Sequence, residues 1–178
     1  MLRIARVELL SAAVLAAAVL AVPTAMAKTS DRQQDMTLDA GYQDGSLQND
    51  GITVLKQGVV MTQGTLEIHA DHGEVVRKGG EVVSATFYGS PVTMQQQQDD
   101  GTMMTGHSDR LDYDFANNLA TLTGNYTVTS PKGSNSGQKM VYNTNTGNMQ
   151  SGGDGTRVHT VIKPKNPAPA APAKPGGN

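Results

Sequence analysis

The stretch GHSDRLDYDFANNLATLTGNYTVT, residues 106–129, decides the fold that we predict for this chain. Apolar and polar side chains alternate on both sides of the Asn117-Asn118 pair. The apolar set is Leu111, Tyr113, Phe115, Ala120, Leu122, Tyr126 and Val128. Alternate residues of a strand point to opposite faces, and Asn favours tight turns. The stretch therefore predicts a β-hairpin with one buried face.

The same alternation recurs on both sides of this hairpin. Further strands are expected around 34–40, 52–54, 59–62, 65–71, 75–76, 82–88, 92–94, 139–143 and 157–162, with polar loops at 41–51, 95–101 and 130–136. After the first 27 residues no stretch carries apolar residues at the spacing of a helix face. The sequence therefore predicts an all-β protein.

Glycines recur at a loose interval along this series of strands. Gly58, Gly89, Gly124 and Gly153 each close an alternating apolar stretch, with spacings of 31, 35 and 29 residues. This spacing predicts hairpin repeats of about 30 residues that stack into one continuous core. A stack leaves two edges, here 34–40 and 157–162, which can accept strands of other chains. Proline at Leu38 and at Val158 should each block a different partner.

The chain divides into three segments. Residues 1–27 have a short basic start, an apolar run and an Ala25-Met26-Ala27 cleavage pattern, which predict a signal peptide; the alternative is an uncleaved membrane anchor. Residues 28–163 are expected to form the β domain. Residues 164–178, rich in Pro, Ala and Gly, predict a flexible tail.

Charge and cysteine usage exclude some classes of function. Residues 28–162 contain nine Lys and Arg against fifteen Asp and Glu, a net charge of −6. A non-specific nucleic-acid-binding protein needs a basic face, so we expect no nucleic-acid partner. The sequence has no cysteine, so the exported domain has to fold without disulfides.

Candidates for catalysis or metal binding are weak. His69, Asp71 and His72 are the best metal candidates, but only the first two share a strand face, and a structural zinc site needs four ligands. Asp112 and Asp114 share a face with each other, which the alternation of a solvated strand already explains. We therefore predict no enzyme activity, no metal and no cofactor.

The expected interior is rich in methionine. Seven methionines follow the leader, several of them at inward positions: Met36, Met61, Met94, Met103, Met104, Met140 and Met149. Methionine adapts to irregular shapes. Two interpretations stay open here: ordinary core packing, or a groove that holds acyl chains.

Five stretches together resemble one known family. They are VVMTQGTLEIHAD (59–71), GSPVT (89–93), GHSDRLDYDFANNLATLTGN (106–125), GQKMVYNTNTGNMQ (137–150) and RVHTVIKPK (157–165). In these stretches the chain resembles the OstA-like (LptA) family of periplasmic lipopolysaccharide transport proteins. The resemblance covers roughly residues 31–165.

The resemblance implies a fold and a function. The fold is a twisted, V-shaped antiparallel β-jellyroll whose groove shields the acyl chains of lipid A. The function is a periplasmic bridge that carries lipopolysaccharide from the inner to the outer membrane. Its partners are LptC at the N-terminal edge, LptD at the C-terminal edge, and further copies stacked end to end. No cofactor is implied.

The family's lipid-contacting positions correspond to five residues of this sequence: Met36, Leu38, Met94, Tyr113 and Phe115. All five also lie on the apolar side of the alternation. The charge balance suggests that affinity comes mainly from acyl burial, with the head group near three cations: Arg32, Arg77 and Lys78.

Two other functions compete with lipid transport. The first is a β-scaffold that polymerises through its edges and carries no lipid. The second is a secreted carbohydrate-active enzyme on a β-solenoid. The inward Met, Tyr and Phe side chains favour the lipid carrier over the scaffold, and the lack of a convincing carboxylate pair argues against the enzyme.

Overall fold

The computed structural model describes residues 29–46 and 48–165, nearly all of which belong to one antiparallel β-sheet. Its strands are β1 (Met36–Asp44), β2 (Gly51–Gln63), β3 (Leu66–Ala70), β4 (His72–Lys78), β5 (Glu81–Gln97), β6 (Met103–Asp114), β7 (Leu119–Ser130), β8 (Gly133–Asn143), β9 (Met149–Ser151) and β10 (His159–Ile162). A 3-10 helix, η1 (Thr29–Gln33), precedes them. The predicted signal peptide and most of the predicted tail lie outside the described residues.

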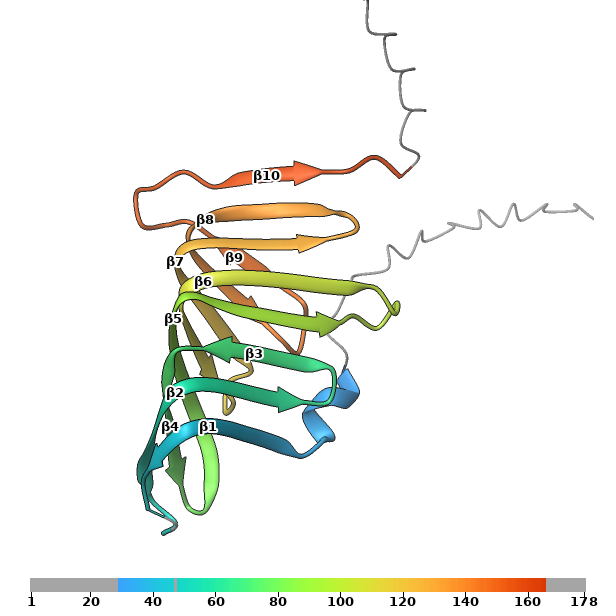
Figure 1. The fold of residues 1–178 in the computed structure, drawn as a ribbon. Helices are drawn as coiled ribbons and strands as arrows, with labels where there is room; N and C mark the ends of the chain where they lie inside the picture. Colours follow the sequence, from blue (N-terminus) through green and yellow to red (C-terminus); the bar gives the residue numbers. More distant parts are fainter. Residues whose placement is uncertain (1–28, 47, 166–178) are drawn as a thin grey trace, which may run out of the picture.

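The sheet runs in the order β1-β2-β3-β5-β6-β7-β8-β10 (Figure 1). Strands β3 and β4 both lie between β2 and β5, each covering one half of their length. In the same way, β9 and β10 pair with opposite halves of β8. Each pair of short strands therefore occupies the place of one long, interrupted strand.

The long strands bend near their middle, and the bends lie side by side across the sheet. The pairing register shifts at 40/42 in β1, 88/92 in β5, 107/110 in β6 and 123/126 in β7. Extra residues in one strand of an antiparallel pair kink that strand and increase its twist. The aligned bends fold the single sheet into two leaves.

Each leaf is made of strand halves. Leaf 1 contains residues 36–40, 59–63, 66–70, 92–97, 103–108, 126–130, 133–137 and 159–162. Leaf 2 contains residues 42–44, 51–56, 72–78, 81–88, 110–114, 119–123, 139–143 and 149–151. The first strand, β1, and the last strands, β9 and β10, form the two ends of this folded sheet.

The core lies between the leaves. Its most completely buried apolar side chains come from both: Leu55, Phe87, Leu111, Leu122 and Met140 from leaf 2, and Val59, Met61, Ile68, Val92 and Tyr126 from leaf 1. Burial of one such side chain contributes about 1.5 to 3 kcal/mol. This packing, not a disulfide, holds the leaves together.

The structure confirms the all-β prediction and the central hairpin. Strands β6 and β7 pair with Leu111 opposite Leu122 and Tyr113 opposite Ala120, and all four side chains are buried. The turn covers residues 115–118, so Phe115 follows the strand instead of belonging to it. Its backbone N–H still donates to Val83 O at 3.0 Å, which keeps it at the edge of leaf 2.

Several expected boundaries were wrong. The first strand runs over 36–44, not 34–40, and the last begins at His159, two residues later than expected. The expected loop at 95–101 continues β5 to Gln97, and the expected loop at 130–136 contains the start of β8. Polar composition was misleading because Gln96 and Asn135 are buried and hydrogen-bonded, Gln96 to Asp31 of η1 and Asn135 to Tyr126 of the neighbouring strand.

The recurring glycines mark bends as well as ends. Gly58 and Gly124 lie in the middle of β2 and β7 with φ of 80° and 78°, and Gly89 lies within β5. Gly153 lies between β9 and β10, where the chain crosses from leaf 2 to leaf 1. Left-handed backbone is accessible to Gly without steric cost, which explains its use at the bend.

Alanine substitution at the two bend glycines should separate backbone strain from crowding. Gly58→Ala has open space around the new Cβ, so we expect only the left-handed strain of about 1 to 2 kcal/mol. At Gly124 the new Cβ would also collide with the Asp109 side chain, which Asn125 Nδ2 hydrogen-bonds. We therefore expect Gly124→Ala to lower the free energy of unfolding in urea more than Gly58→Ala does. Equal losses would contradict this account of the bend.

Candidate functional site

The open side of the folded sheet, opposite the bends, contains a cavity of about 270 Å³ between the two leaves. It is lined by Arg32, Met36, Gln63, Val82, Tyr113, Phe115 and Asn118. The Tyr113 and Phe115 rings pack against each other with centroids 4.3 Å apart. We call this space the mouth cavity. Its lining combines apolar side chains with one cation, Arg32.

Three of the five predicted acyl-contacting residues meet in the mouth cavity. Met36 comes from leaf 1, while Tyr113 comes from the end of β6 in leaf 2 and Phe115 from the turn that follows it. Leu38 does not line it but packs, partly buried, against the core cluster two residues further along β1. Val82 also lines the cavity and was not predicted, although it lies in a strand that the sequence predicted.

Met94 lies deeper in the interior. It lines a small apolar cavity of about 50 Å³ together with Met104, Ala120, Leu122, Val128, Met140, Tyr142 and Met149. Four of these eight residues are methionines. Because methionine side chains are flexible, this part of the interior can change shape more easily than one built from branched residues.

The opposite end of the interior opens beside β10. A cavity of about 250 Å³ there is lined by residues that include Met104, Tyr142, Met149 and Val161. Asn135 links four strands at this end: its Oδ1 accepts from Tyr126 Oη at 2.6 Å and Ser151 Oγ at 3.1 Å, and its Nδ2 donates to Thr160 Oγ1 at 2.8 Å. Polar contacts therefore border this opening, and they include a bond between the leaves.

The three predicted head-group cations do not lie together. Arg32 borders the mouth cavity and donates from Nη1 to Asn118 Oδ1 and Asn145 Oδ1, both at 3.0 Å, and from Nη2 to Thr144 O at 2.9 Å. Arg77 and Lys78 lie at the β4–β5 hairpin and line none of the interior cavities described above. Of the three predicted cations, Arg32 is thus the one that borders an interior cavity.

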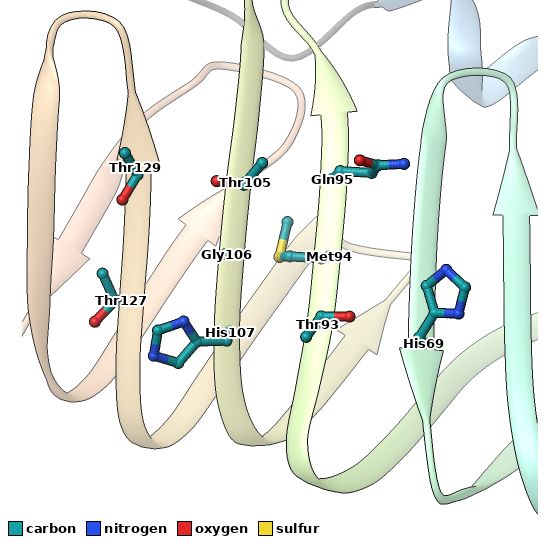
Figure 2. Close-up of a pocket in the computed structure, with 9 residues that line it drawn as sticks. All are labelled: His69, Thr93, Met94, Gln95, Thr105, Gly106, His107, Thr127 and Thr129. Atoms are coloured by element: carbon teal, nitrogen blue, oxygen red, sulfur yellow. The ribbon is translucent and has the colours of Figure 1, made fainter.

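A further depression of about 430 Å³ lies on the outer face of leaf 1 (Figure 2). His69, Thr93, His107 and Thr127 are successive cross-strand partners there. His69 Nε2 lies 2.6 Å from Glu67 Oε1, and hydrogen bonds from Gln95 and His69 lower the pKa of the Glu67 carboxyl. Apart from Met94 and Gly106, its lining is hydroxyl, amide and imidazole groups, so this surface differs in chemistry from the interior, although Met94 lines both.

The residues weighed for metal or acid–base chemistry have other contacts. His72 stacks on Tyr88 with ring centroids 4.9 Å apart, and Arg110 lies over the same ring. Asp112 accepts hydrogen bonds from Arg110 and Thr86, and the bonds to Asp112 raise the pKa of Arg110. In the part of the chain that the structure describes, no group of three His, Cys, Asp or Glu side chains is arranged to hold a metal.

The structure also bears on membrane spanning. No helix within residues 29–46 and 48–165 has the length and apolar character needed to cross a bilayer.

Two known proteins with sequences similar to this chain have the same name. The chain is 34% identical over 174 residues to the lipopolysaccharide export system protein LptA of Escherichia coli K12, which covers 93% of this chain and 94% of that protein. It is 30% identical over 154 residues to the protein of the same name from Haemophilus influenzae, covering 84% and 89%.

The fold has a solved counterpart. The crystal structure of LptH from Pseudomonas aeruginosa, described as the LptA-homologous periplasmic component of the lipopolysaccharide transport device, superposes with a TM-score of 0.66. The match covers 76% of this chain and 99% of that one at 23% sequence identity, which establishes likeness of fold alone.

The family model described as LptA/(LptD N-terminal domain) LPS transport protein matches residues 37–148. This range starts in β1 and ends just before β9, so it contains most of both leaves and most of the mouth cavity lining, but not Arg32, Met36, β9 or β10. The family is one of transport proteins, not of enzymes. Together with the two relatives of 30% identity or more, this match establishes that the chain belongs to the LptA/LptD N-terminal domain family of lipopolysaccharide transport proteins.

Proposed function

We propose that this protein binds lipopolysaccharide by holding lipid A acyl chains between its two leaves, and that it carries this lipid across the periplasm from the inner to the outer membrane. One observation carries the proposal: the mouth cavity joins an apolar lining of Met36, Val82, Tyr113 and Phe115 to the cation of Arg32. An amphiphile with acyl chains and an anionic head group complements both. The names of the relatives support the same cargo.

Acyl burial supplies most of the proposed affinity. Each CH₂ group removed from water contributes about 0.8 kcal/mol, so partial shielding of one chain is worth several kcal/mol. The net charge of −6 over residues 28–162 disfavours strong binding of anionic phosphates over the whole surface. We assign the acyl contacts to Met36, Leu38, Met94, Tyr113 and Phe115. Among the cations, the position of Arg32 favours it over Arg77 and Lys78 for the head group.

The two ends of the sheet are the proposed docking edges. Within the described residues, β1 pairs only with β2, and β10 pairs only with β8. Apolar side chains are exposed near the last strands: Met149 (51%), Val161 (43%) and Ile162 (83%). Unpaired edges accept further strands by backbone hydrogen bonding. We propose that the β1 edge meets LptC, that the β10 edge meets LptD, and that copies of this chain stack through the same edges.

The domain boundaries form part of the proposal. A cleaved signal peptide at 1–27 would deliver the β domain, 28–163, to the periplasm, which agrees with the description of LptH as a periplasmic component. The exposed edges also fit the alternative of a polymerising scaffold without lipid cargo. Lipid binding separates the two functions, since a scaffold needs none.

The first test is titration of the purified chain with lipopolysaccharide. We expect saturable binding that weakens at least about tenfold in Phe115→Asp, because a carboxylate in an apolar site is costly to bury. Ala116→Asp adds the same charge one residue further on, at an exposed position, and serves as the control. If a folded wild type bound no lipopolysaccharide, the scaffold would replace the carrier.

The docking edges can be tested with prolines. Lys163 N donates to Lys132 O, so the alternation of an antiparallel ladder puts the Ile162 amide on the free edge of β10. Ile162→Pro should therefore block the C-terminal partner while the sheet stays intact. Leu38→Pro in β1 should block the N-terminal partner. Co-purification with each partner, alongside circular dichroism, measures both effects, and two variants that assemble normally would refute end-to-end docking.

A further inference from the structure

Helix η1 lies across the open side of the molecule, beside the turn between β2 and β3 (Figure 1). Its first attachment is to leaf 1 through Asp31, whose side chain is 3% exposed. The carboxylate accepts hydrogen bonds from Thr65 Oγ1 and from Gln96 Nε2, the latter at 3.1 Å. A Cβ at Gly64 would lie 2.8 Å from Asp31 Cα, so the β2–β3 turn packs closely against η1.

The second attachment of η1 is to leaf 2 through the next residue, Arg32. Its three acceptors are Asn118 in the β6–β7 turn and Thr144 and Asn145 in the β8–β9 turn. All three acceptor groups are neutral. Within residues 29–46 and 48–165, no carboxylate forms an ion pair with Arg32. Two adjacent residues thus join the leaves across the mouth, and one attachment is a cation without a counter-ion.

The interior is too small for lipid while this bridge is in place. Taken one by one, the mouth cavity holds about 270 Å³, the methionine-lined cavity about 50 Å³ and the cavity beside β10 about 250 Å³. Pockets that enclose even a drug-sized molecule measure roughly 300 to 1,000 Å³. Acyl chains of a lipid need more space than this, so the leaves have to separate at the mouth. The aligned bends fix the opposite side, and the Asn135–Ser151 bond lies at the other end of the interior, beside β10. The η1 bridge is therefore the connection at the mouth that has to yield.

We propose that η1 is a strap that closes the mouth. The phosphate of an incoming acylated lipid releases this strap by accepting the hydrogen bonds that Arg32 otherwise donates to Asn118, Thr144 and Asn145. This inference rests on the proposed lipid-binding function and adds its control step. Asn118, Thr144 and Asn145 offer Arg32 only neutral oxygens, whereas a phosphate offers a negative charge and can accept two parallel N–H bonds from the guanidinium, so the exchange is favourable. Asp31 is buried and keeps η1 attached to leaf 1, so Arg32 is the end that moves.

The test is the rate at which a fluorescent lipopolysaccharide inserts into the chain, followed by stopped-flow mixing. The variant Asn118→Gly/Asn145→Ala removes two acceptors but keeps Arg32; glycine suits position 118 because its φ is 57°. We expect insertion about three- to tenfold faster, since the strap loses two of the hydrogen bonds that Arg32 donates to leaf 2. Asn125→Gly, also at positive φ but in the bend, is the matched control and should leave the rate unchanged.

The role of phosphate needs a second comparison, between intact lipopolysaccharide and the same preparation after removal of its lipid A phosphates. Wild type should take up the dephosphorylated lipid roughly tenfold more slowly. Arg32→Gln should take up both lipids at similar rates, because its strap is weakened and its cation is gone.

The outcomes distinguish the strap from the function itself. If the folded Asn118→Gly/Asn145→Ala variant inserted lipid no faster than wild type, the strap would be wrong while lipid binding stood. If Arg32→Gln kept the full preference for phosphorylated lipid, another group would recognise the phosphate and the release step would be wrong. If wild type bound neither lipid at equilibrium, the proposed function would fail and the strap with it.

Discussion

The alignment of bends in neighbouring strands is the constraint on which the rest of this structure depends. Strands in one hydrogen-bonded sheet cannot bend independently, because the ladder fixes their spacing and register. Here Gln57 and Gly58 in β2 and Gly124 and Asn125 in β7 all adopt positive φ at the same level of the sheet. A single sheet thereby supplies both walls of its own interior. The strand side chains of the core face inward because of this fold line.

The fold line also makes the two sides of the molecule mechanically unequal. On the side of the bends, continuous backbone and ladder hydrogen bonds connect the leaves. On the open side, apart from the packing of the core, side-chain hydrogen bonds connect them: those of Asp31 and Arg32 in η1, and the Asn135–Ser151 bond near β10. Breaking a few side-chain bonds costs far less than disrupting a ladder. Any cargo too large for the resting cavities has to enter from the open side.

The sequence was sufficient to predict the hairpins but not the bends within the strands. In β2 the alternation of inward and outward residues continues through the bend, since the inward residues Leu55 and Val59 are an even number of residues apart. In β6 the alternation shifts by one residue at the bend, since the inward residues Ser108 and Leu111 are three residues apart. In a sequence, such a shift in the alternation looks like the end of a strand, so glycines that lie within strands were predicted to end them. The apolar side of the site was predictable from alternation, as Tyr113 illustrates. That Arg32, but not Arg77, borders the cavity depends on where η1 lies, which local pattern does not encode.

An interior that contacts its cargo mainly through apolar side chains suits a protein that transfers this cargo onward. Hydrophobic attraction has no preferred direction, so a chain shielded by flexible side chains such as Met94, Met104 and Met140 can shift along them without breaking oriented bonds. Oriented polar groups would hold the lipid at one place, and in the described interior they lie mainly at its two ends, around Arg32 and Asn135. In the function that we propose, the middle of the interior shields acyl chains while the two ends control when they enter and leave.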